Sequence, residues 1–171
     1  MKLTARFWTL ESARRSGLVD AFKPVEHRLS EPRLKFFSRT RAQMISPWPA
    51  YMAKHAQEEA EFPHSGVAFA DLERLLPGGT GPFSLELPES AELCASCEAS
   101  VALIDAVAAR AINATLAATP LSHADVVRFY QEDLRPLTNP RDAEFILAAH
   151  RQLTMWCGKV TAGRIGMLMV G

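Results

Sequence analysis

The sequence predicts a mainly helical fold, an irregular bundle of about five to seven helices with a small β or irregular patch near residues 64–88. Three observations lead to this expectation. Apolar residues after Pro88 recur at steps of three and four, the spacing of one helix face. Prolines and capping residues divide the chain at lengths typical of helices. Between residues 63 and 88, glycine and proline interrupt every periodic pattern.

In the first third of the chain, apolar spacing and prolines predict three helices. The first covers residues 7–22 and stops before Pro24, because proline cannot continue a helix. The second is capped by Ser30 and ends at Pro47. The third is short and polar and covers residues 51–61.

The rest of the chain predicts one short strand and four more helices. Strict alternation predicts a strand over residues 83–87, and residues 71–76 look helical. The strongest expectation is one long, alanine-rich helix over residues 89–119. Ser122 and Asp125 resemble a capping box that opens the next helix. A long final helix follows from residue 139, and its glycines weaken its second half.

Length and composition bound the fold and its setting. The chain has 171 residues, of which 48% are hydrophobic and 22% charged, which is typical of a globular protein and excludes a disordered or collagen-like chain. We expect one helical domain over residues 1–171, with a possible sub-boundary at 63–88. Residues 1–10 hold no apolar run of signal-peptide length, and three cysteines are an odd number, so we expect a cytoplasmic protein with free thiols.

Charge argues against a membrane span and against a general attraction to nucleic acid. Four basic side chains interrupt the most apolar stretch: His150, Arg151, Lys159 and Arg164. Each such cation costs about 2.5–3.5 kcal/mol at a bilayer centre, so we expect no membrane segment. The nineteen Lys and Arg balance the nineteen Asp and Glu. Ten of the basic residues lie within residues 1–41 and ten of the acidic ones within residues 42–105, and we expect these two parts to complement each other.

Cys94 and Cys97 form a CxxC pair at the start of the predicted long helix. A helix N-terminus stabilises a thiolate, so redox chemistry is one interpretation. We favour a structural role, because Cys97 falls on the apolar stripe and no strand precedes the pair as in thioredoxin-like folds. A zinc site is a further hypothesis. It needs His150 and Cys157 of the final helix to meet Cys94 and Cys97.

Two surfaces are candidates for binding a partner. Trp48 and Tyr51 lie in a proline-stiffened segment, and both residue types are enriched among interface anchors. That Trp48 caps the core is an equally good interpretation. The apolar tail with Met167 and Met169 is the second candidate, because these side chains are costly to leave exposed.

Residues 28–41 interleave basic side chains with two phenylalanines, as nucleic-acid surfaces do. In that interpretation Arg33, Arg39 and Arg41 contact phosphates. The same spacing fits an ordinary helix with its phenylalanines in the core and its cations in water. We favour this second interpretation because the net charge is zero.

The leading functional hypothesis is a non-catalytic accessory subunit that binds a protein or peptide, in a homo- or hetero-oligomer. Its partner could be a larger, peptide-modifying enzyme. The alternative is a small thiol- or metal-dependent enzyme centred on the three cysteines and His150, with zinc as its cofactor. Nucleic-acid binding through residues 28–41 is the weaker alternative. The sequence holds no hydrolase, dinucleotide-binding or kinase motif. An active site can still be assembled from distant residues, so whether the chain is an enzyme stays open.

Overall fold

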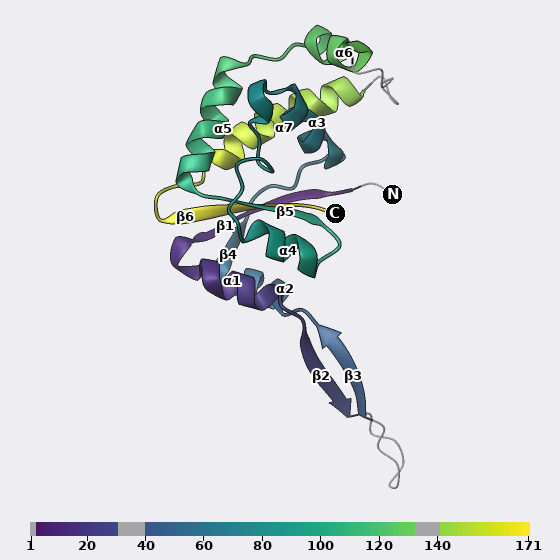
Figure 1. Ribbon diagram of the computed structural model, residues 1–171, viewed down its shortest axis with the longest axis vertical. Helices are drawn as coiled ribbons and strands as arrows, with labels where there is room; N and C mark the ends of the chain where they lie inside the picture. The colour runs from purple at the N-terminus through teal and green to yellow at the C-terminus, as the bar shows by residue number, and fades with distance from the viewer. Residues whose placement is uncertain (1–2, 31–39, 133–140) are drawn as a thin grey trace.

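A four-stranded antiparallel sheet separates the helices into two layers (Figure 1). The computed structural model describes residues 3–30, 40–132 and 141–171. The strand order is β4-β1-β6-β5. The strands are β1 Ala5–Glu11, β4 Ala56–Glu58, β5 Ser100–Ile104 and β6 Arg164–Val170. The mainly helical, all-α bundle predicted from the sequence is therefore wrong, and the fold mixes α-helix with β-sheet.

One face of the sheet packs against the longer helices. Phe7, Ala102 and Leu168 point into this layer, because alternate residues of a strand face opposite sides. The covering helices are α3 Val67–Leu75, α5 Ala106–Ala118, α6 His123–Glu132 and α7 Asp142–Cys157. The Trp156 ring of α7 stacks on Phe7 at 5.1 Å and on Phe69 at 5.3 Å between ring centroids. This layer holds the larger core.

The other face packs against three short helices. Trp8, Leu103 and Met167 point into this layer. The covering helices are α1 Arg15–Phe22, α2 Trp48–His55 and α4 Ser90–Ser96. A 3₁₀ turn, η1 Ser12–Arg14, leads from β1 into α1. Among the described residues, every helix is too short or too polar to cross a bilayer.

The helix predicted over residues 7–22 is wrong in its first half, which forms β1. The four residues from Phe7 to Leu10 are all buried, because the sheet is covered on both faces. A strand of this kind reads as a continuous apolar run and cannot be distinguished from a buried helix by periodicity. The predicted helix survives only as α1, which ends before Pro24 as expected.

A two-stranded hairpin projects from the layer of short helices (Figure 1). It consists of β2 Val25–Ser30 and β3 Thr40–Ile45, with Val25 opposite Ile45 and Ser30 opposite Thr40. The predicted helix capped by Ser30 is therefore wrong, since both described ends of that segment are strands. Arg33 and Arg39 of the nucleic-acid hypothesis lie outside the described residues. Arg41 occupies a position in β3 opposite Leu29.

The long helix predicted over residues 89–119 is divided by a strand. The segment forms α4, then β5, then α5. The backbone leaves the helix at Cys97, whose φ is −144° and ψ 160°. The Asp105 carboxylate then caps α5 by accepting the Val107 and Ala108 N–H groups at 2.9 and 2.8 Å. The apolar run of β5 matched a helical stripe because it is buried on both faces.

The final helix ends earlier than predicted. Helix α7 stops at Cys157, and the glycine-containing half of the predicted helix forms β6, an inner strand of the sheet. Gly166 is required there, because a Cβ at this position would collide with the Phe7 ring. The glycines therefore do not weaken a helix here, and of the roles considered for them, close packing against a neighbour is the one seen at Gly166.

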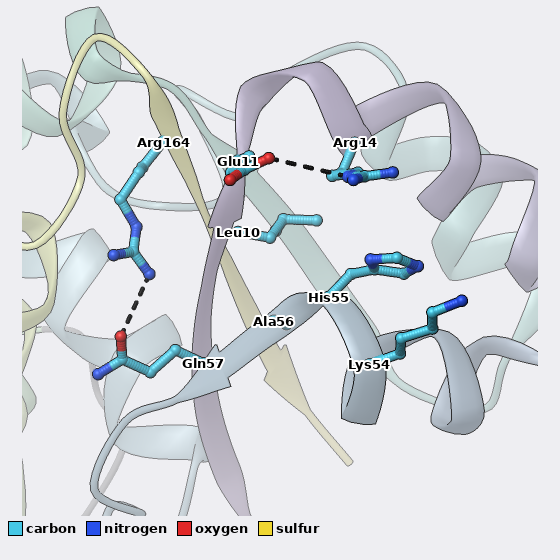
Figure 2. A pocket seen from close by; sticks show the side chains of 8 residues that line it. All are labelled: Leu10, Glu11, Arg14, Lys54, His55, Ala56, Gln57 and Arg164. Carbon is cyan, nitrogen blue, oxygen red and sulfur yellow. Dashed lines mark hydrogen bonds and ion pairs between the residues drawn. The ribbon is translucent and has the colours of Figure 1, made fainter.

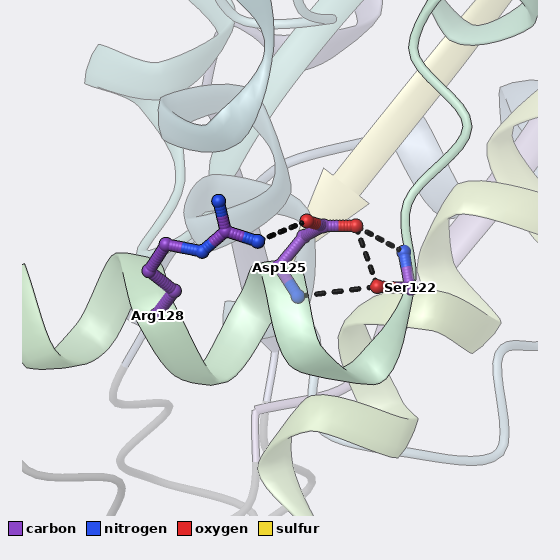
Figure 3. A network of polar contacts seen from close by, with 3 residues as sticks. All are labelled: Ser122, Asp125 and Arg128. Atoms are coloured by element: carbon purple, nitrogen blue, oxygen red, sulfur yellow. Dashed lines mark hydrogen bonds and ion pairs between the residues drawn. The ribbon is translucent and has the colours of Figure 1, made fainter.

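Two further expectations concern local signals. The capping box is confirmed: Asp125 accepts the Ser122 N–H at 2.9 Å, and the Ser122 hydroxyl accepts the Asp125 N–H at 3.2 Å (Figure 3). Arg128 adds an ion pair to Asp125 at 2.9 Å. Residues 83–87, predicted as a strand, instead form a turn and irregular backbone after the 3₁₀ turn η2 Pro77–Gly79. The helix predicted over 51–61 is α2 followed by β4.

Candidate functional site

Trp48 begins helix α2 and is half-buried. Its ring stacks on Phe22 at 5.1 Å and meets the edge of Trp8 at 6.4 Å between centroids. These two contacts fix the orientation of the Trp48 ring and cover one side of it. Its remaining surface faces a hollow, so Trp48 both closes the core and lines this hollow.

The hollow lies between α2 and the outer part of the sheet and has a volume of about 370 Å³. We call it the tryptophan hollow. Its lining residues are Arg6, Trp8, Trp48, Pro49, Met52, Ala53, Ala56 and Glu58. Two tryptophans and Met52 make its floor apolar. Arg6 pairs with Glu58 at 3.8 Å, which places one cation and one carboxylate among its walls. Its volume lies within the range of about 300–1,000 Å³ typical of ligand pockets.

Strand β4 borders this hollow and is the last strand on its side of the sheet. The Glu59 N–H donates to the Phe7 carbonyl at 2.8 Å, and Gln57 lies opposite Thr9. In an antiparallel ladder, only alternate residues bond to the partner strand. Glu58, between Gln57 and Glu59, therefore directs its N–H and C=O away from β1. The Ala56 carbonyl faces the same way, while the Ala56 N–H closes α2 by donating to Met52.

Tyr51 lies outside the hollow and joins two helices. Its hydroxyl donates to the Arg14 carbonyl at 2.8 Å, and its ring lies 4.6 Å from that of His55. A Cβ at Gly17 would meet this hydroxyl, so α1 approaches α2 closely because residue 17 is glycine. Tyr51 thus positions α2 and, with it, Trp48.

The C-terminal methionines do not form an exposed surface. Met167 is fully buried in β6, where it faces Trp8 on one neighbouring strand and Leu103 on the other. Met169 is half-buried against the same core. The cost of exposing these side chains is thus avoided within the chain itself.

Cys94 and Cys97 lie at the C-terminal end of α4, where a helix disfavours a thiolate. The long helix predicted from the sequence placed them at an N-terminus instead. The Cys94 Sγ accepts the Val101 N–H at 3.1 Å and donates to the Val101 carbonyl at 3.3 Å. Burial raises the pKa of the Cys97 thiol, which donates to the Leu93 carbonyl at 3.2 Å. Both contacts support the structural interpretation of the pair.

His150 and Cys157 lie on α7, on the opposite side of the sheet from Cys94 and Cys97. Burial raises the pKa of Cys157 to about 12. The His150 Nε2 lies 3.2 Å from the Leu116 carbonyl and 3.3 Å from that of Thr119. No three His, Cys, Asp or Glu side chains among the described residues come close enough to hold a metal ion. A thiol- or metal-dependent enzyme stays a prediction, and these four residues do not meet here.

A second cleft, of about 630 Å³, contains two carboxyl groups that the sequence did not indicate. Glu73 is 8% exposed and accepts the Phe83 N–H at 3.0 Å and the Ser84 hydroxyl. Burial and the nearby Glu73 raise the pKa of Glu86. Such a carboxyl can deliver a proton at a higher pH than an ordinary one. Gly81 is the residue of the sequence that reflects this cleft, because a Cβ at position 81 would collide with the Glu73 side chain.

No protein-family model, curated protein or solved structure matches this chain.

Proposed function

We propose that the chain is a non-catalytic binding subunit that takes up an extended segment of a partner protein or peptide beside β4. One apolar side chain of that segment would occupy the tryptophan hollow. The observation that carries the proposal is the position of this hollow, which is lined by Trp8, Trp48 and Met52 and borders an edge strand. The accessory role predicted from the sequence is the broader form of the same proposal.

The backbone of β4 and the hollow supply complementary parts of such a site. An added strand would hydrogen-bond the outward N–H and C=O of Glu58 and the outward carbonyl of Ala56. Because β4 has only three residues, these bonds are few. Affinity and selectivity would therefore come mainly from the apolar side chain that enters the hollow, and Arg6 and Glu58 would select for polar neighbours.

The projecting hairpin supports a partner on the same side of the molecule. Val25 is 51% exposed, Met44 61% and Ile45 38%, and all three lie at the base of the hairpin. Only Ser46 and Pro47 separate this base from Trp48. A two-stranded hairpin is marginally stable in water when nothing packs against it. Val25 and Ile45 share one face of the hairpin, because they are directly opposite each other, and Met44 lies on the other face. A partner that contacts the first face would bury Val25 and Ile45 and stabilise the hairpin.

The test is selection of randomised eight-residue peptides against the full chain, followed by affinity measurement on the variants. We expect the selected peptides to share an aromatic or large aliphatic residue. We expect Trp48→Ala to weaken their binding at least about tenfold, as for an interface anchor. Binding should also slow hydrogen exchange of the Glu58 amide. The matched control is Val107→Ala, since Val107 is 66% exposed on α5 in the opposite layer.

Two results would contradict the proposal. One is a set of selected peptides whose affinity is unchanged by Trp48→Ala in a variant that keeps its melting temperature. The other is binding that leaves the Glu58 amide unaffected and perturbs α5 or α7 instead. Either result would place partner binding away from β4.

A further inference from the structure

Another hollow, of about 590 Å³, is separate from the two already described. It lies at the end of the sheet where β1 leads into α1 (Figure 2). Its lining residues are Leu10, Glu11, Arg14, Lys54, His55, Ala56, Gln57 and Arg164. We call it the cationic pocket. The lining residues come from β1, η1, the end of α2, β4 and the start of β6, so only the folded chain brings them together.

Positive charge dominates this pocket. Arg14, Lys54 and Arg164 are permanently charged, whereas Glu11 is its one carboxylate, 3.8 Å from the Arg14 guanidinium. The side chains of the lining therefore carry a net charge of plus two, and the Glu59 carboxylate lies just outside the lining, 3.4 Å from the Thr9 hydroxyl to which Arg164 donates. The pocket is distinct from the tryptophan hollow, with which it shares only Ala56.

Hydrogen bonds fix the Arg164 side chain, and one of its N–H groups has no partner among the described residues. Its Nη2 donates to the Thr9 hydroxyl at 2.6 Å. The same atom donates to the Gln57 side-chain oxygen at 3.3 Å (Figure 2). Its buried Nε–H has no hydrogen-bond partner among the described residues. A buried N–H without a partner is uncommon in native structures, and a small shift of the Arg164 side chain would bring it to an anion in the pocket.

His55 reports the electrostatic field of the pocket. Its partial burial lowers its pKa, and Arg14 and Lys54 lower the pKa further, against a smaller opposite effect of Glu11. The Tyr51 ring packs beside it at 4.6 Å between centroids. A bound anion would offset the two cations and raise the pKa of His55.

We propose that the cationic pocket binds the phosphate group of a small phosphate monoester. Such a group carries about −1.5 to −2 charges at neutral pH, which is opposite in sign and close in size to the net charge of the lining. Guanidinium groups suit phosphate oxygens because they offer paired donors in one plane. The volume leaves room for an organic group beside the phosphate. A phosphodiester, with one charge, would leave half of the positive charge uncompensated. This inference does not depend on peptide binding at β4.

The experiment titrates the full chain with inorganic phosphate, phenyl phosphate and dimethyl phosphate while following the His55 ring signals by NMR. The His55→Asn variant identifies those signals. We expect phosphate and phenyl phosphate to raise the pKa of His55 and to bind at least about fivefold more tightly than the diester. We expect Arg14→Gln and Lys54→Gln each to weaken binding by about fivefold. Arg110→Gln, an exposed cation on α5, is the matched control and should change nothing.

Equal affinity for monoester and diester would overturn the proposal, as would affinity that Arg14→Gln and Lys54→Gln leave unchanged. An unmoved pKa of His55 at saturating phosphate would also overturn it. A single-stranded oligonucleotide that binds more tightly than phenyl phosphate, and loses that affinity in Lys54→Gln, would reassign the pocket to nucleic acid. All of these variants replace partly exposed side chains, so loss of folding is not the expected cause of an effect.

Discussion

The two edges of the central sheet differ in whether their outward N–H and C=O groups are bonded within the chain. At the β5 edge, the outward groups of Val101 and Leu103 are all bonded within the chain. Cys94 bonds both the N–H and the C=O of Val101. The Ser90 hydroxyl accepts the Leu103 N–H at 2.9 Å, and the Leu87 N–H donates to the Leu103 carbonyl at 2.7 Å. At the β4 edge, the corresponding groups of Glu58 face outward beside the tryptophan hollow.

This difference indicates which edge is available to a partner. An open edge strand is an aggregation hazard that proteins usually cover, shorten or charge. Here β5 is covered by α4 and its preceding turn, whereas β4 is only kept short and bears Glu58.

The largest effect is expected from proline on β4, placed in either of two registers. Gln57→Pro removes an N–H that bonds to β1 and the side-chain oxygen that Arg164 contacts, so it should destabilise the fold by about 3 kcal/mol. Glu58→Pro removes an N–H that faces away from β1 and should cost about 1 kcal/mol or less. Glu58→Pro should nevertheless weaken binding of the selected peptides, because an added strand loses the outward Glu58 N–H as a donor. Urea unfolding followed by circular dichroism measures the first effect, and peptide titration measures the second.

The order of the two proline variants is the decisive outcome. If Glu58→Pro destabilises the protein as much as Gln57→Pro, the outward groups of β4 are bonded within the chain, and this edge is as closed as that of β5. If both variants fold and both bind peptide as tightly as the original protein, strand addition at β4 is wrong.

An intermediate effect is expected from Ser90 at the closed edge. Ser90→Ala leaves the buried Leu103 N–H without its acceptor, and an unsatisfied buried group costs about 1–3 kcal/mol. The control is Ser96→Ala on the same helix, whose exposed hydroxyl bonds only the Glu92 carbonyl. That variant should stay within about 0.5 kcal/mol of the original protein. Equal losses in the two variants would mean that the helix, rather than the strand edge, needs these hydroxyls.

The sequence indicated local structure best where one side chain decides it. Ser122 and Asp125 form a self-contained cap, so their pattern was sufficient. The strands were missed because β1, β5 and β6 are covered on both faces, which removes the alternation that marks a half-exposed strand. Asp105 was the overlooked signal in the long helical stripe, because its cap marks a second helix start.

Only part of the candidate site could be predicted from the sequence, because residues that are distant along the chain meet in the fold. Trp48 could be found because a tryptophan between prolines is unusual by itself. The cationic pocket could not, because Arg14, Lys54 and Arg164 come from three distant segments that only the sheet order brings together. The net charge of zero gave no indication of a cationic pocket, because a sum over the whole chain does not show where positive charges gather.

The smallest effect is expected at Cys94, and it separates the structural interpretation of the CxxC pair from a chemical one. Cys94→Ala removes both bonds to Val101, and sulfur hydrogen bonds are weak, so we expect a loss of about 1 kcal/mol. Hydrogen exchange at the Val101 amide should accelerate, while exchange at Leu103, held by Ser90, should change little. Cys94→Ser should restore most of the protection, because a hydroxyl both donates and accepts. If instead Cys94→Ala leaves the Val101 amide protected, Cys94 does not close this edge, and the thiol regains its place as a candidate reactive group.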